Sequence, residues 1–70
     1  MKVIEVIADA GHGDTIRGIA EQHEALDVWS GAPDENGRQS VRLLVSSEHR
    51  QAVLDALQGI LSGSEAGIHQ

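Results

Sequence analysis

Apolar and polar residues alternate at the start of the chain, and this period of two predicts a β-strand over residues 2–8. Ile4, Val6 and Ala8 form one face of that strand. The opposite face carries Glu5, so we assign the first face to the core. Valine and isoleucine favour a pleated strand, because their branched side chains pack well there.

Two later segments have apolar residues at helical spacing. The first helix is expected to begin near Asp14, because an aspartate can cap the free amides of a first turn. Its buried positions are Ile16, Ile19, Ala20 and His23. The second helix is expected over residues 47–61, with Ser46 or Ser47 as its cap. Its buried positions are Val53, Leu54, Leu57, Ile60 and Leu61.

Residues 26–30 and 39–45 are typical of a second and a third strand. The segment between them contains Asn36-Gly37, the dipeptide most typical of a two-residue type I′ hairpin turn. It also contains Pro33, which has no amide hydrogen to donate and therefore belongs in a loop or on an edge strand. The sequence thus predicts a β-hairpin whose first strand lies at the edge of the sheet.

The predicted turn also sets which residues face each other. A two-residue loop at Asn36-Gly37 puts Val28 opposite Val45 and Trp29 opposite Leu44. Val28 then shares the core face with the valines of the third strand, and Trp29 lies on the outer face. A loop longer or shorter by one residue would instead turn Trp29 into the core, because side chains alternate along a strand.

The order β-α-β-β-α is that of a ferredoxin-like, or split βαβ, α+β fold without a clear fourth strand. We expect one domain over residues 1–62, with a three-stranded antiparallel sheet and two helices on one face. The third strand should lie between the first two. The first strand would then be an open edge with unpaired backbone groups. Residues 63–70 are expected to be a flexible tail or the start of a linker.

Composition and charge exclude several kinds of site and partner. The chain has no Cys, which excludes disulfides and thiolate metal sites. Its formal net charge of −6 argues against nucleic acid as a partner, because binding to phosphates relies on Lys and Arg. It contains no apolar run near the ~20 residues of a membrane-spanning helix. Glu5 and Asp9 interrupt the early apolar stretch, so it does not read as a signal peptide.

The chain resembles the N-terminal domain of a family of multi-pass membrane proteins known as domain of unknown function family 389. The resemblance rests on residues 1–7, on Val28-Trp29, and on residues 34–38, 41–45 and 50–57. It implies a cytoplasmic domain, or one at the cytoplasmic face of the inner membrane, with the membrane portion of a parent protein as a partner. The chain could be an excised domain or a free-standing relative. The family offers no accepted activity or site residues to carry over.

The histidines raise the question of a metal site. Two pairings with carboxylates that lie close in the sequence are His12 with Asp14 and His23 with Glu24. Neither pairing has the spacing of a zinc motif. We therefore expect no metal ion and no cofactor, with His23 as a half-buried side chain near a helix end.

Little in the sequence suggests catalysis. The chain has neither Cys nor Tyr and lacks a serine in a nucleophile elbow. Glu5 and Arg42 should meet on the outer sheet face, since the first and third strands are expected to be neighbours. A cross-strand ion pair explains them better than a general acid with its partner. We expect a protein that is not an enzyme.

The segment Gly11-His12-Gly13-Asp14 joins the first strand to the first helix and is a candidate ligand-binding loop. Free amides at a helix N-terminus can bind anions. Asp14 already places negative charge there and no Lys or Arg is adjacent in the sequence, which disfavours phosphate. A ligand with an ammonium group would fit better, and a tight turn before a helix is the plainer explanation.

The most informative prediction concerns the outer face of the sheet. It should expose apolar side chains, including the only aromatic residue of the chain, around one ion pair. Such clusters often mark contacts. The candidate interface residues are Val3, Glu5, Ile7, Trp29, Arg42 and Leu44.

Two function classes follow. The first is an association domain that forms a homo-oligomer or docks onto a larger, membrane-embedded protein. The second is a small-molecule-sensing regulatory domain, with its ligand at residues 11–14 or at a subunit interface.

Overall fold

Seven elements follow one another in the computed structural model, which describes residues 1–61 and 67–69. They are β1 (Lys2–Asp9), the short 3-10 helix η1 (Ala10–His12), α1 (Gly13–Gln22), β2 (Asp27–Ser30), β3 (Arg38–Val45), α2 (Arg50–Leu61) and β4 (Gly67–His69).

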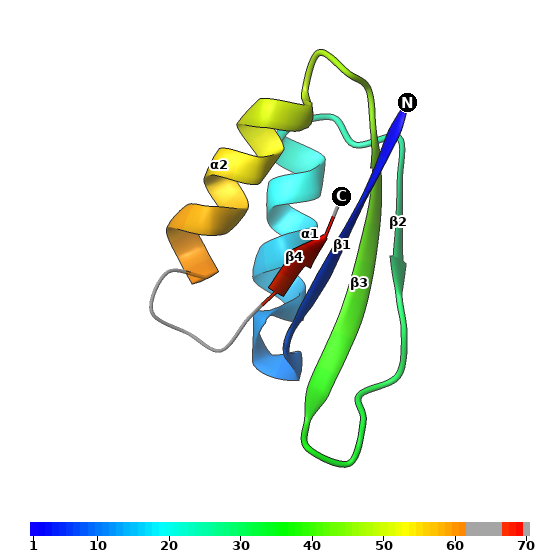
Figure 1. The fold of residues 1–70 in the computed structure, drawn as a ribbon, viewed down its shortest axis with the longest axis vertical. Coiled ribbons are helices and arrows are strands. Elements are labelled where there is room, and N and C mark those ends of the chain that lie inside the picture. Colours follow the sequence, from blue (N-terminus) through cyan, green and yellow to red (C-terminus); the bar gives the residue numbers. More distant parts are fainter. Residues whose placement is uncertain (62–66, 70) are drawn as a thin grey trace.

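The strands form one antiparallel sheet in the order β2-β3-β1-β4. Both helices lie on the same side of this sheet, and among residues 1–61 and 67–69 no helix covers the other side (Figure 1). The predicted α+β, ferredoxin-like arrangement is therefore confirmed, including the place of the third strand between the first two. The prediction of three strands was wrong, because the sheet has four.

The fourth strand closes the edge that the sequence analysis left open. Gly67–His69 pairs antiparallel with β1, placing Ile68 opposite Val6. Part of the tail predicted over residues 63–70 thus belongs to the sheet, and the remainder lies outside the described residues. β4 thus covers the edge of β1 at Glu5, Val6 and Ile7, and the backbone of these residues is not open to pairing with a second chain.

The core lies between the sheet and the two helices. β1 contributes the alternate residues Ile4, Val6 and Ala8, which are buried. The helices supply Ile16, Ile19 and Ala20 from α1 and Val53, Leu54, Leu57 and Leu61 from α2. These match the predicted core faces. Two predicted positions are only half-buried: His23, which forms the C-cap of α1, and Ile60 of α2.

The hairpin has a different register from the predicted one, but its side chains lie on the predicted faces of the sheet. Val28 lies opposite Leu43 and Trp29 opposite Arg42, a shift of two residues from the predicted pairs. A shift of two leaves each side chain on its predicted face, because side chains alternate with a period of two. Trp29 is therefore on the outer face, with 48% of its surface exposed. β2 is an edge strand, as predicted.

The register shifts because the loop is longer than a type I′ turn. Only Gly37 has a positive φ there (+76°), whereas type I′ needs two such residues. Asp34 organises the turn instead: its carboxylate Oδ1 accepts hydrogen bonds from the amides of Asn36 and Arg38, both at 2.9 Å. Asp34 also pairs with Arg38 through the backbone, because its amide donates to the Arg38 carbonyl at 2.7 Å.

Each helix begins at a different residue from the one predicted. α1 starts at Gly13, after η1, so Asp14 lies in its first turn and does not cap it. α2 starts at Arg50, and the preceding residues form a turn in which the Ser46 carbonyl accepts from the amides of His49 and Arg50. β1 runs directly into η1, and a short turn separates β3 from α2; the side-chain pattern reveals neither.

Two glycines test how backbone conformation affects stability, Gly37 in the turn and Gly18 in α1. A Cβ at Gly37 or Gly18 would have no heavy atom within 4 Å, so backbone conformation alone sets the effect. We expect Gly37→Ala to lower the free energy of unfolding by about 1 kcal/mol, because Gly37 is in the left-handed region. We expect Gly18→Ala to raise it by up to about 1 kcal/mol, because Gly18 is inside a helix. Urea denaturation followed by far-UV circular dichroism measures both, and changes of the same sign would contradict the turn geometry.

Candidate functional site

All of the predicted interface residues lie on the uncovered sheet face. Val3 and Trp29 are each 48% exposed. Arg42 is exposed, and the others are half-buried. They come from three adjacent strands, because β3 lies between β1 and β2. Strand alternation brings together the whole predicted set: Val3, Glu5, Ile7, Trp29, Arg42 and Leu44.

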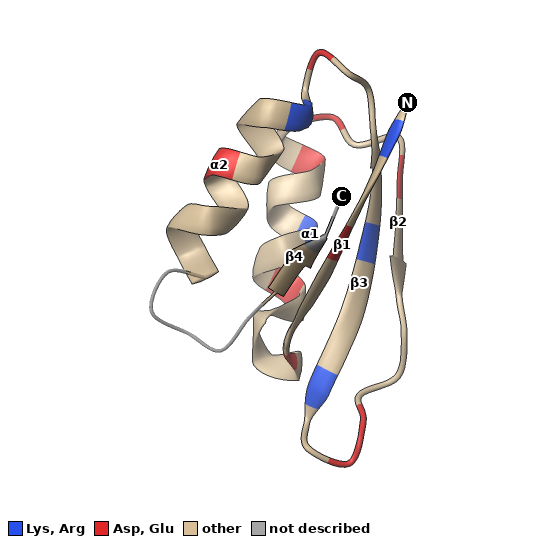
Figure 2. Ribbon diagram, in the orientation of Figure 1, with Lys and Arg blue, Asp and Glu red and all other residues tan. Residues whose placement is uncertain are grey.

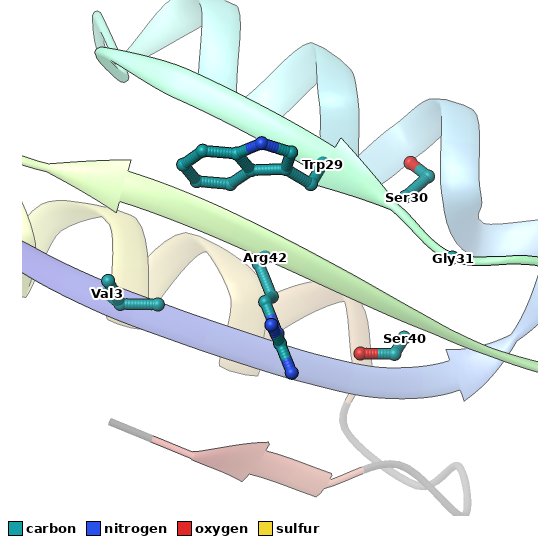
Figure 3. Close-up of a pocket in the computed structure, with 6 residues that line it drawn as sticks. All are labelled: Val3, Trp29, Ser30, Gly31, Ser40 and Arg42. Carbon is teal, nitrogen blue, oxygen red and sulfur yellow. The ribbon is translucent and has the colours of Figure 1, made fainter.

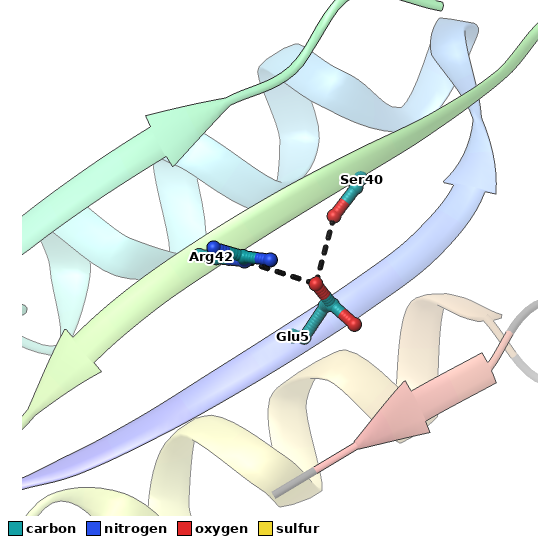
Figure 4. A network of polar contacts seen from close by, with 3 residues as sticks. All are labelled: Glu5, Ser40 and Arg42. Carbon is teal, nitrogen blue, oxygen red and sulfur yellow. Dashed lines mark hydrogen bonds and ion pairs between the residues drawn. The ribbon is translucent and has the colours of Figure 1, made fainter. Parts of the chain in front are cut away.

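A polar network crosses the middle of this face (Figure 4). Glu5 of β1 lies opposite Arg42 of β3, and Arg42 Nε donates to Glu5 Oε2 at 3.0 Å. The same carboxylate oxygen accepts from the hydroxyl of Ser40 at 3.2 Å. The predicted meeting of Glu5 and Arg42 is confirmed. The Glu5 carboxylate therefore fixes the orientation of the guanidinium over the sheet.

A hollow of about 500 Å³ lies beside this network, between β2, β3 and β1 (Figure 3). The Trp29 ring lies along β2, Arg42 extends from β3 toward β1, and Val3 stands on β1 (Figure 3). The lining residues are Val3, Trp29, Ser30, Gly31, Ser40 and Arg42. Arg42 is the one charged residue among them. The hollow thus combines a flat aromatic surface with a single guanidinium.

Three of these lining residues were not singled out from the sequence: Ser30, Gly31 and Ser40. Ser30 and Gly31 stand where β2 ends and the loop begins. The Ser30 hydroxyl is bound from the helix side, because it accepts from Nη2 of Arg17 at 2.7 Å. Gly31 is held by Gln39, whose Nε2 donates to the Gly31 carbonyl at 2.8 Å. Ser30 and Gly31 follow Trp29 directly in the sequence, whereas Ser40 is brought beside them by the observed register, in which the Gly31 amide donates to the Ser40 carbonyl. The side-chain pattern carried no signal for Ser40.

The other candidate site, residues 11–14, does not contribute to the hollow. Gly11 and His12 belong to η1, and Gly13 and Asp14 begin α1. A Cβ on Gly13 would lie 3.0 Å from the side-chain oxygen of Gln39, so the end of that side chain would have to shift slightly. Gly18, by contrast, has space around it. The segment reads as a tight turn into a helix.

Charge is spread over the molecule (Figure 2). One further cluster links two loops: Ser46 Oγ is 2.8 Å from His49 Nδ1, and His49 Nε2 is 3.7 Å from Glu24 Oε2. Over residues 1–61 and 67–69, no three His, Asp or Glu side chains lie close enough to hold a metal ion together. None of the helices in these ranges has the length and apolar character needed to cross a bilayer.

The architecture recurs in solved structures. The apo form of CPII from Thiomonas intermedia K12, a nitrogen regulatory PII-like protein, superposes with a TM-score of 0.86. The match covers 96% of this chain and 82% of that one, at 9% sequence identity. The chain has the fold of nitrogen regulatory PII-like proteins.

A second CPII structure, with bound ADP, AMP and bicarbonate, gives a TM-score of 0.79 at 10% identity and covers 96% of this chain and 79% of that one. No protein-family model matches the sequence, and no curated protein matches it either. At such identities the PII-like likeness concerns the fold, and the residues of the hollow have to be argued from this chain.

The ion pair on the outer face should contribute little to stability. Arg42 is 62% exposed, so water screens its attraction to Glu5. We expect a double-mutant cycle of Glu5→Gln and Arg42→Gln to give a coupling free energy of about 0.5 kcal/mol by urea denaturation. Glutamine keeps an oxygen that can accept from Ser40, so the cycle isolates the charge. The coupling should shrink in 1 M salt. A value above about 2 kcal/mol, unchanged by salt, would mean that the pair is shielded from water.

Proposed function

We propose that this protein is a non-catalytic regulatory domain that senses a small molecule at the hollow on its outer sheet face. The observation that carries the proposal is this hollow, which lies on an uncovered sheet face of a PII-like fold. Its volume falls in the usual range for small-ligand sites, roughly 300–1,000 Å³. Its lining mixes apolar surface with one charged group, which is typical of sites that bind small ligands.

The PII-like likeness favours sensing over docking. CPII from Thiomonas intermedia K12 is described as a nitrogen regulatory protein, and one of its structures holds ADP, AMP and bicarbonate. A shared fold supports a shared kind of role only by analogy, so the ligand is argued from this chain. The docking of the domain onto a membrane-embedded parent, its cytoplasmic location and the resemblance to family 389 remain predictions from the sequence.

We also propose that copies of the chain assemble through the outer face, so that the hollow and its ligand lie at the seam between the copies. Val3 and Trp29 are half exposed there, and the adjoining Ile7 and Leu44 are only half-buried. A domain of 70 residues has a small core, and covering this face would add to the apolar area removed from water. The Glu5–Arg42 ion pair lies at the centre of this face. It would favour one orientation of the two copies, because burying either charge without its partner would cost free energy.

Sensing predicts stabilisation by a ligand. We expect one class among amino acids, adenine nucleotides, bicarbonate, small aromatic acids and divalent metal ions to raise the melting temperature in a saturable way. A ligand at about 100 times its Kd stabilises the native state by about 2.7 kcal/mol, which is roughly 10–20 °C for so small a domain. Sodium chloride at matched ionic strength is the control. If no compound of the panel shifts the melting temperature, the sensing role is wrong.

Assembly predicts a change in sedimentation. We expect the wild-type chain at micromolar concentration to sediment as a species larger than one chain. Trp29→Arg should sediment as a monomer, because it places a charge in the proposed contact. Gln58→Arg adds the same charge at an exposed position of α2 and should leave the assembly intact. A wild-type protein that stays monomeric, or an equal effect of the two variants, would rule out this contact.

A further inference from the structure

The guanidinium of Arg42 makes a hydrogen bond within the described residues through one of its three nitrogens. Its Nε donates to Glu5, while its two terminal nitrogens have no hydrogen-bond partner within residues 1–61 and 67–69. An arginine carries five N–H donors in a fixed plane, so four of them remain directed away from this bond. The Glu5 contact favours one orientation of the group, which lowers part of the entropy that a ligand would lose on binding it.

The Trp29 indole lines the same hollow, on the β2 side, whereas the guanidinium of Arg42 extends to the β1 side (Figure 3). The two residues face each other across β2 and β3 on the outer side of the sheet. About half of the indole is exposed, and Val3 completes an apolar wall of the same hollow. Indole faces stack with flat rings, which adds to the free energy gained by apolar burial. A flat ring seated on Trp29 would place a substituent on its rim close to Arg42.

The surrounding charge selects the kind of anion. Among the described residues that line the hollow, Arg42 is the one that is charged, and Glu5 already offsets part of its charge. The chain as a whole has a formal net charge of −6. A phosphate ester with nearly two negative charges would meet one shared guanidinium and a neighbouring carboxylate. A single carboxylate matches the geometry of two guanidinium N–H groups and carries only one charge.

We propose that the hollow binds a small planar ring bearing one carboxylate, with the ring on the Trp29 indole and the carboxylate on the terminal nitrogens of Arg42. This inference rests on the proposed sensing function and names its ligand class. It differs from the nucleotides and bicarbonate seen with CPII, and it uses residues of the outer sheet face that the fold likeness does not assign.

The experiment follows Trp29 directly. The chain has one Trp, so its indole N–H gives a single, unambiguous signal in a ¹⁵N correlation spectrum. Wild-type protein is titrated with nicotinate and benzoate, and with nicotinamide and benzamide as uncharged counterparts. We expect the acids to shift the indole signal in a saturable way and the amides to bind at least 10-fold more weakly. Cyclohexanecarboxylate, which has the charge but no flat ring, should also bind more weakly.

Variants separate the two parts of the site. Arg42→Gln should weaken binding of the acids at least 10-fold and leave the amides unchanged. Arg50→Gln removes the same charge at the start of α2, on the helix side of the sheet, and should leave all four Kd values unchanged. Trp29→Leu should reduce the preference for flat rings over cyclohexanecarboxylate, measured by calorimetry. The same spectra show whether each variant is folded.

The outcomes distinguish this inference from the function on which it depends. If AMP or ADP shifts the indole signal and the aromatic acids do not, the assignment of a carboxylate is overturned and sensing stands. It is likewise overturned if a ligand raises the melting temperature while the indole signal stays fixed and Arg42→Gln has no effect. If no compound in either series binds, the sensing function fails together with it.

Discussion

The pairing of β1 with β3 is the constraint on which the rest of the structure depends. These two strands face each other over eight residue pairs at the centre of the sheet. Alternation along both strands sends Ile4, Val6, Val41 and Leu43 to one side, where they are buried by the helices. The same alternation leaves Glu5 and Arg42 on the other side. The core and the candidate site are thus two faces of one ladder, and a one-residue slip would exchange them.

Much of this could be read from the sequence, because it depends on periodicity. Ile4, Val6 and Ala8 follow a period of two, and the helices place apolar residues at a period of 3.6, so their buried faces were predictable. The outer position of Trp29 followed from the alternation of side chains between the two faces of a strand. It was therefore correct even though the loop is longer than Asn36-Gly37 suggested. The hydrogen bonds of Asp34 compete with the two-residue turn, and local composition does not reveal which prevails.

The parts that could not be predicted involve short or distant contacts. β4 has three residues, of which only Ile68 is apolar, so no pattern marks it as a strand. It is held by its pairing with β1 at the far end of the chain, which is a tertiary contact. The hollow likewise needs the actual register, because Ser40 lies beside Trp29 and Gly31 only when Trp29 is paired with Arg42. A prediction from pattern locates the face but not the cavity on it.

The two-residue offset in the hairpin bears on how this loop can change during evolution. β2 touches the rest of the sheet only through β3, and the loop before β3 closes on itself through Asp34. Insertions or deletions that move β2 by an even number of positions would leave its inward and outward residues where they are. Odd steps would carry the indole inward. Homologues should therefore vary in length between β2 and β3 mainly in ways that preserve this parity, and the loop is the place to graft new recognition segments.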